Sequence, residues 1–147
     1  MARSRNNFPS PAVMTMAEQA AQLRYYYPES KVVNLDHGNL IWRCELTPSE
    51  ISDIYTIEIR YSSDDFPKMY VVKPKPLMLY PGATELPHVF NSKRQEICTH
   101  FFGEWNWSMP LATTYGPWAS RWLHSYETWV VTGKWIGHSY HNGVFTD

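Results

Sequence analysis

Apolar residues recur every three or four positions near the start of the chain, and this spacing predicts an amphipathic helix from Ala12 to Tyr27. Pro28 ends this helix, because the residue before a proline is disfavoured in helical geometry. Residues 1–10 are polar and are expected to be flexible. The face of the helix that we expect to be buried carries Val13, Met16, Ala20, Leu23 and Tyr27.

Apolar and polar residues then alternate, which predicts antiparallel strands at Leu40–Leu46 and Ile54–Tyr61. A third run, Lys68–Lys73, ends at Pro74 and Pro76, which cannot donate hydrogen bonds to a sheet. Three consecutive strands favour a meander. The expected inner faces of the first two strands carry Leu40, Trp42, Cys44 and Leu46, and Tyr55, Ile57, Ile59 and Tyr61.

The stretch from Leu77 to Pro110 has no sustained pattern, and only the short run His88–Phe90 is typical of a strand. Proline, glycine and polar residues interrupt the rest. Loops of this length in a compact domain are usually functional. We therefore expect a functional site in this part of the chain.

A second amphipathic helix is predicted from Tyr115 onward. Gly116 is expected to cap it, Pro117 suits its first helical position, and Gly133 suits its end. Its apolar face is expected to carry Trp118, Trp122, Leu123, Tyr126, Trp129 and Val130.

The order helix, meander, long loop, helix predicts an α+β fold with the helices packed on one side of an antiparallel sheet. The chain has 147 residues, a length that suits one domain over residues 1–147. Its 44% hydrophobic and 18% charged residues favour a packed core over a disordered chain.

The net charge of −1 gives no basic surface for nucleic acid or anionic lipid. No phosphate-binding glycine loop is present, so no nucleotide cofactor is expected. The opening residues lack the apolar run of a secretion signal, and no segment approaches the roughly 20 apolar residues that span a bilayer. A cytoplasmic protein with reduced cysteines is the prediction.

Cys44 and Cys98 are predicted to differ in role. Cys44 lies on an apolar strand face and is expected to be an inert packing residue. Cys98 lies outside the predicted elements and close in sequence to Lys93 and Arg94, whose positive charge would raise its thiolate fraction. A nucleophilic role requires a sulfur that is reachable from solvent, and we expect this of Cys98.

Three other interpretations of Cys98 remain open. It can be an inert core residue like Cys44. With His100, His138 and His141 it could bind zinc, although the Cys-x-His spacing is cramped, and the favoured prediction is that there is no metal. It could also act in a Cys-His hydrolase with His88 or His100 as base, but no nearby residue supplies the third, orienting group.

The order and spacing of these segments resemble the ubiquitin-conjugating enzyme family over roughly residues 40–135. His88 lies ten residues before Cys98, as the histidine of the family's His-Pro-Asn signature precedes the active cysteine. The Trp-Ser-x-Pro run that begins at Trp107 resembles a family segment beyond that cysteine, and Met69–Pro76 is similar to its proline-marked strand. The resemblance implies a ubiquitin-conjugating (UBC-like) fold in which the long loop carries the active site.

Ile97-Cys98 and residues 117–137 resemble still more closely the prokaryotic branch of this family, which accompanies cyclic-oligonucleotide-based antiphage signalling (CBASS) operons. This resemblance implies a thioester-forming transferase that regulates antiphage signalling. Its partner would be a cGAS/DncV-like nucleotidyltransferase, whose C-terminal carboxylate Cys98 would hold as a thioester and pass to an amine.

The sequence departs from the family pattern at the signature. Valine replaces the proline after His88, so the implied role of His88 is to support the loop. Phe90 stands where the family asparagine would fall, which leaves Asn91 as the oxyanion candidate. Trp105 and Trp107 are expected to shape the site. These departures also favour an alternative, a non-catalytic variant of the same fold that binds the partner.

Overall fold

The computed structural model describes residues 12–137, 139–141 and 144–146. The predicted flexible segment 1–10 lies outside the described residues. The elements in chain order are α1 (Met16–Tyr26), β1 (Lys31–Leu35), β2 (Asn39–Leu46), β3 (Tyr55–Ser62), β4 (Lys68–Lys73), β5 (Val89–Asn91), β6 (Glu96–Ile97), the 3-10 helix η1 (Leu111–Thr113), α2 (Tyr115–Thr132), β7 (Ser139–His141) and β8 (Val144–Thr146).

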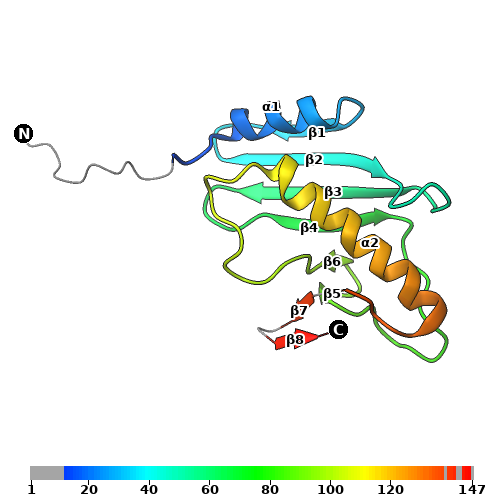
Figure 1. Cartoon of the computed structure of the whole chain (residues 1–147). Helices are drawn as coiled ribbons and strands as arrows, with labels where there is room; N and C mark the ends of the chain where they lie inside the picture. The colour runs from blue at the N-terminus through cyan, green and yellow to red at the C-terminus, as the bar shows by residue number, and fades with distance from the viewer. Residues whose placement is uncertain (1–11, 138, 142–143, 147) are drawn as a thin grey trace, which may run out of the picture.

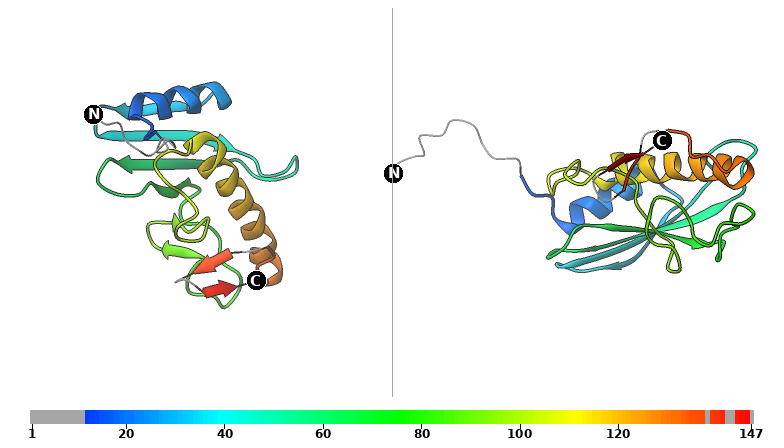
Figure 2. Two further views of the ribbon diagram at one scale, coloured as in Figure 1. Left: turned by 60° about the vertical axis from the view of Figure 1, so that its left-hand side comes forward. Right: turned by 90° about the horizontal axis from the view of Figure 1, so that it is seen from below.

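Six of the strands form one sheet in the order β1-β2-β3-β4-β6-β5, and β7 pairs with β8 in a separate two-stranded sheet (Figure 1). Neighbouring strands in both sheets are antiparallel. Both helices lie on the same face of the six-stranded sheet, as the view from below in Figure 2 shows. The predicted α+β arrangement, with helices on one side of an antiparallel sheet, is therefore confirmed.

Helix α1 begins later than the predicted Ala12 because of its N-terminal cap. The Thr15 hydroxyl accepts a hydrogen bond from the Glu18 backbone, and the Glu18 carboxylate accepts one from the Thr15 backbone. This reciprocal capping box satisfies two backbone donors of the first turn. Val13 precedes the helix and is exposed, so its expected place on the buried face is wrong. The buried face consists of Met16, Gln19, Ala20 and Leu23.

The predicted meander forms β2, β3 and β4, but it is only the middle of the sheet. Its register pairs Cys44 with Ile57 and puts both side chains on the helix side. Strand β1 extends the sheet beyond β2, and its side chains are mostly exposed, so it has no buried face that alternation could reveal. Strands β5 and β6 are too short to give a sequence pattern.

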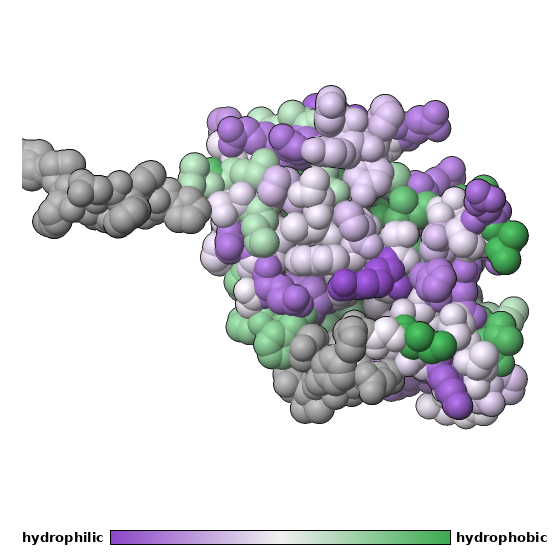
Figure 3. All heavy atoms as spheres, in the orientation of Figure 1, coloured by the Kyte–Doolittle hydropathy of each residue, from purple (hydrophilic) through white to green (hydrophobic). Residues whose placement is uncertain are grey.

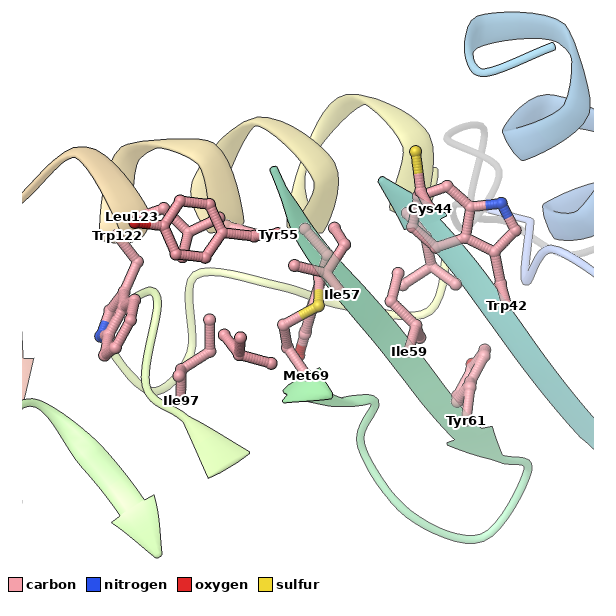
Figure 4. Close-up of a cluster of buried hydrophobic side chains, with 14 of the residues drawn as sticks. Trp42, Cys44, Tyr55, Ile57, Ile59, Tyr61, Met69, Ile97, Trp122 and Leu123 are labelled. Carbon is pink, nitrogen blue, oxygen red and sulfur yellow. The ribbon is translucent and has the colours of Figure 1, made fainter. Parts of the chain in front are cut away.

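The core lies between the sheet and the helices (Figure 4). Trp42, Ile57 and Ile59 from the sheet and Leu123 from α2 are fully buried. Each such side chain stabilises the fold by roughly 1.5–3 kcal/mol. Cys44 belongs to this cluster, as the alternation of β2 predicts.

The predicted end of α2 is confirmed, whereas the predicted cap at its start is wrong. Gly133 is the C-cap in the left-handed region, with φ 79°, and its N–H donates to the Trp129 carbonyl at 2.7 Å. Gly116, expected as the cap, instead lies inside the first turn. The Tyr27 hydroxyl fills the space beside it, and a Cβ on Gly116 would come within 2.2 Å of that oxygen. Glycine is needed there for close packing.

On the face of the sheet away from the helices, Glu58 is almost completely buried. Its carboxylate accepts hydrogen bonds from Arg43 and Arg60, and the Arg60 guanidinium lies 4.0 Å above the Tyr70 ring. Burial raises the pKa of Glu58, but the two arginines lower it more, so the net shift is downward. The ion-pair cluster therefore keeps its carboxylate charged.

The surface on the helix side is mixed, and in Figure 3 hydrophobic side chains form separate groups among polar ones. Neither helix in the described part of the chain combines the length and the apolar character needed to cross a bilayer.

Candidate active site

Cys98 directly follows β6 and is held by backbone hydrogen bonds. Its N–H donates to the His88 carbonyl at 3.0 Å, and the same carbonyl accepts the Trp122 indole N–H at 2.9 Å. This one oxygen thus ties the Cys98 backbone to the residue just before β5 and to α2. The His88 ring lies 4.4 Å from the Trp135 ring, measured between centroids. The structure therefore brings His88 and Cys98 together through the His88 backbone.

Gln95 anchors the turn between β5 and β6, and sequence reasoning gave it no role. It is buried, and its amide makes three hydrogen bonds: Oε1 accepts from Leu77 N at 2.7 Å, and Nε2 donates to the carbonyls of Val71 at 2.8 Å and Pro74 at 3.1 Å. These bonds join the turn to β4 and to the proline segment after it. The backbone three residues before Cys98 is therefore tightly held.

The Cys98 side chain is buried, so the expectation of an open, solvent-reachable sulfur is wrong. Only 5% of the residue is exposed, and its thiol donates to the His100 carbonyl at 3.6 Å. Burial raises the pKa of Cys98, and the bond to His100 only partly opposes that shift. Arg94, expected to favour the thiolate, instead lies 3.9 Å from the Glu96 carboxylate. The thiolate fraction at neutral pH is thus below that of an unperturbed cysteine.

Cys98 nevertheless forms part of the wall of a pocket of about 320 Å³. The wall comes from six segments: the turn between β3 and β4, β4 itself, β5, β6, the loop after β6 and the start of α2. Its main apolar members are Phe66, Met69, Ile97, Phe102, Trp105 and Tyr115. A ligand in this pocket would lie directly against Cys98.

His100 also lines the pocket, and its ring is held on two sides. It stacks on Trp118 with 4.4 Å between ring centroids and meets Tyr115 edge-on at 4.9 Å. Its Nδ1 lies 3.0 Å from the Thr99 hydroxyl, and Arg121 donates to the Thr99 carbonyl at 3.1 Å. Burial lowers the pKa of His100 to about 4. The ring is therefore neutral at pH 7 and a much weaker base than a free imidazole.

The other predicted site residues are placed differently. Asn91 uses its side-chain oxygen to accept the Arg94 N–H at 2.8 Å, which caps the turn between β5 and β6, and Asn91 does not line the pocket. Trp105 is buried in the wall. Trp107 stacks on Phe66 with 4.8 Å between centroids, beside the pocket but outside its wall. Of this group, only Trp105 is brought into the pocket with Cys98.

Tyr115 and Phe66 are pocket residues that sequence reasoning missed. The Tyr115 hydroxyl donates to the Pro67 carbonyl at 3.1 Å, and this bond ties the start of α2 to the turn that carries Phe66. Phe66 did leave a signal, because a large aromatic residue in the polar turn Ser62–Pro67 is unusual. Tyr115 left none beyond its place at a helix start.

Both cysteines are free thiols, as predicted, and no disulfide joins them. Burial raises the pKa of Cys44 to about 11, with a further contribution from Glu45. In the part of the chain that the structure describes, no three His, Cys, Asp or Glu residues gather as metal ligands. The zinc interpretation also invoked His138 and the His141 side chain, which lie outside the described residues.

The fold and the pocket define an α+β protein that is compatible with an E2-like architecture and has Cys98, directly after a short strand, in the wall of the pocket. A family model described as "Type II CBASS E2 protein" matches residues 19–142. The chain belongs to this family of CBASS-associated E2-like proteins, and the family implies an E2-like role in CBASS. A search of curated proteins found no match.

Proposed function

We propose that this chain is an acyl carrier: Cys98 takes the C-terminal carboxyl group of a cGAS-like nucleotidyltransferase as a thioester and passes it to an amine. The observation that carries the proposal is the position of Cys98 in the wall of a pocket, in a chain of the type II CBASS E2 family. The resemblance of the sequence to ubiquitin-conjugating enzymes supplies the thioester chemistry and the partner.

The first step joins the donor to sulfur. A free carboxylate does not react with a thiol, so the donor must arrive activated, as an acyl adenylate or a thioester made by a separate enzyme. The Cys98 thiol loses its proton, sulfur attacks the acyl carbon, and AMP or the earlier thiol departs. In the second step an amine attacks that carbon, the carbon–sulfur bond breaks, and an amide forms with release of the Cys98 thiol.

The thiol needs a proton acceptor, because burial raises the pKa of Cys98. In the transfer, the proton can go to the leaving group, as the departing thiol or the phosphate of AMP; the His100 ring in the same pocket wall has a pKa of about 4, is too weak a base to hold it, and serves as a fixed aromatic surface. Its contacts with Trp118 and Tyr115 would keep it in one orientation. The predicted oxyanion role of Asn91 would require its amide to turn from the β-turn that it now caps.

The test is a non-reducing gel of the chain mixed with the purified nucleotidyltransferase, ATP and the other proteins of the operon. A thiol-labile adduct is expected with the natural chain and with Cys44→Ser, which removes the other thiol. Cys98→Ser should give a slower, thiol-resistant oxyester. A thiol-labile adduct that persists unchanged in Cys98→Ala would refute the proposal.

A second candidate is a non-catalytic member of the fold that binds the partner and regulates it. The burial of Cys98 and the absence of Asn91 from the pocket wall favour this reading. It predicts that Cys98→Ala retains full protection against phage. If protection disappears while partner binding survives, the binding-only function is excluded.

A further inference from the structure

A second groove, of about 730 Å³, shares no wall residue with the pocket beside Cys98. Its walls come from three segments: the turn between β2 and β3 (residues 47–54), the segment after β4 (residues 74–78) and the second half of α2. None of these segments belongs to the site already described. The groove therefore has to be explained separately from the chemistry of Cys98.

Hydrogen bonds from α2 hold the walls of the second groove together. The Glu127 carboxylate accepts from the hydroxyls of Ser52 at 2.6 Å and Tyr55 at 2.8 Å. One turn of helix away on the same face of the groove, the Tyr126 hydroxyl donates to the Met78 carbonyl at 2.6 Å. Because α2 is bonded to both other walls, the groove is already formed in the single chain. A preformed surface has less conformational entropy to lose on binding.

Each wall of the second groove carries a large apolar side chain that is exposed. Ile51 in the β2–β3 turn is 96% exposed, Met78 after β4 is 74% exposed, and Val131 on α2 is 76% exposed. In Figure 3, hydrophobic side chains lie along the edge of the molecule where Figure 1 shows this turn and the end of α2. Exposed apolar side chains that gather around one groove are typical of a protein-binding surface.

The exposed charges beside the second groove have opposite signs on opposite sides. Glu50 and Asp53 lie in the β2–β3 turn, whereas Lys73 and Lys75 lie at the end of β4 and in the segment after it. In the part of the chain that the structure describes, none of these four residues forms a salt bridge. The surface thus has an acidic side, a basic side and an apolar groove with a projecting isoleucine.

A surface with these properties is complementary to itself. A two-fold rotation places the acidic side of one copy on the basic side of the other, and it places the projecting side chain of each copy at the groove of the other. An unrelated partner would need only one of these features. The net charge of −1 also gives two copies little overall repulsion.

We propose that the second groove binds a second copy of this chain in a two-fold dimer. Ile51 of each copy enters the groove of the other, and the turn that carries Glu50 and Asp53 lies on the Lys73–Lys75 segment of the other. Because the groove shares no wall residue with the pocket beside Cys98, both pockets stay outside these contacts. The proposal is independent of the thioester chemistry.

The test is sedimentation velocity over concentrations from about 1 to 100 µM, which covers dimers held by a small interface. The natural chain should show a concentration-dependent dimer. Ile51→Ala should raise Kd about 10-fold, because the interface loses one apolar side chain that the fold of the single chain does not bury. Lys93→Glu reverses an exposed charge that is not in the groove, and it should leave Kd unchanged.

Two charge-reversed proteins test the two-fold arrangement. One carries Glu50→Lys with Asp53→Lys, and the other carries Lys73→Glu with Lys75→Glu. Each alone should dimerise at least about 10-fold more weakly than the natural chain, because like charges then face one another. An equal mixture of the two should recover a dimer, since the basic turn of one protein then lies on the acidic segment of the other. Recovery also shows that both variants are folded.

A natural chain that stays monomeric at the highest concentration would overturn the proposal and leave the groove to a different protein. A dimer whose Kd is unchanged in both charge-reversed proteins and in Ile51→Ala would also overturn it, because that dimer would form through another face. So would a mixture that stays monomeric when circular dichroism shows both variants to be folded. The gel assay for the Cys98 adduct reports on the proposed function separately.

Discussion

Replacing Gln95 with leucine tests whether the turn before Cys98 depends on one buried amide. Gln95→Leu keeps a side chain of similar size and removes three hydrogen bonds, one to Leu77 N and two to the carbonyls of Val71 and Pro74. At about 1 kcal/mol net for each bond, the free energy of unfolding should fall by about 3 kcal/mol. For a chain of this length that corresponds to a decrease in Tm of about 6–12 °C.

The assay is urea unfolding followed by tryptophan fluorescence, to which seven tryptophans contribute. The matched control is Gln22→Leu, the same exchange at a half-buried position of α1, which should change the unfolding free energy by less than about 0.5 kcal/mol. If Gln95→Leu lowers the free energy of unfolding no more than Gln22→Leu does, the claim that the buried Gln95 amide holds this turn is refuted. Because Gln95 precedes Cys98 by three residues, Gln95→Leu should also speed alkylation of Cys98 by iodoacetamide in the folded protein.

Three further changes test other parts of the structure. Glu58→Gln should lower the free energy of unfolding by only about 1 kcal/mol at pH 7, because the two arginines that bind Glu58 are half exposed. The lowered pKa of Glu58 means that its carboxylate stabilises the fold until the pH falls below that pKa. Urea unfolding curves should therefore show the difference vanish at acid pH, where the natural carboxyl is also neutral. The pKa of His100 is about 4 in the folded protein and about 6.5 in the unfolded chain, so as the pH falls the unfolded chain binds the proton first. The free energy of unfolding should therefore fall by up to about 3 kcal/mol between about pH 6.5 and 4, and His100→Phe should abolish this loss. Gly116→Ala should lower Tm, because the new Cβ would lie 2.2 Å from the Tyr27 hydroxyl oxygen. This clash costs about 1–3 kcal/mol, whereas alanine gains about 1 kcal/mol over glycine in helix propensity. Adding Tyr27→Phe, which removes that oxygen, should restore part of the lost Tm.

Local patterns in the sequence were sufficient for the longer elements α1, β2, β3, β4 and α2, but not for β1 or for the short strand β6. Alternation identified β2 and β3 and placed Cys44 on the buried face, since successive side chains of a strand point to opposite sides of the sheet. The end of α2 followed from Gly133, because glycine adopts the left-handed conformation of a helix cap without strain. The spacing between His88 and Cys98 indicated a ubiquitin-conjugating-like protein, and Ile97-Cys98 with residues 117–137 indicated the CBASS branch whose family model matches residues 19–142.

Contacts between distant segments decided the environment of the cysteine. The pocket wall combines Phe66, Trp105 and Tyr115 from three separate segments, and no local periodicity relates them. Flanking charges predicted an activated Cys98, but the pKa of a thiol depends on everything packed around it, and here burial raises that pKa. Asn91, by contrast, caps a local turn, because its side-chain oxygen accepts the N–H of Arg94 three residues later, and it does not line the pocket. The sequence by itself thus determines which of the longer backbone segments form, because side-chain periodicity and helix caps act over a few residues. Short strands, desolvation and pocket shape are decided only when remote segments pack together.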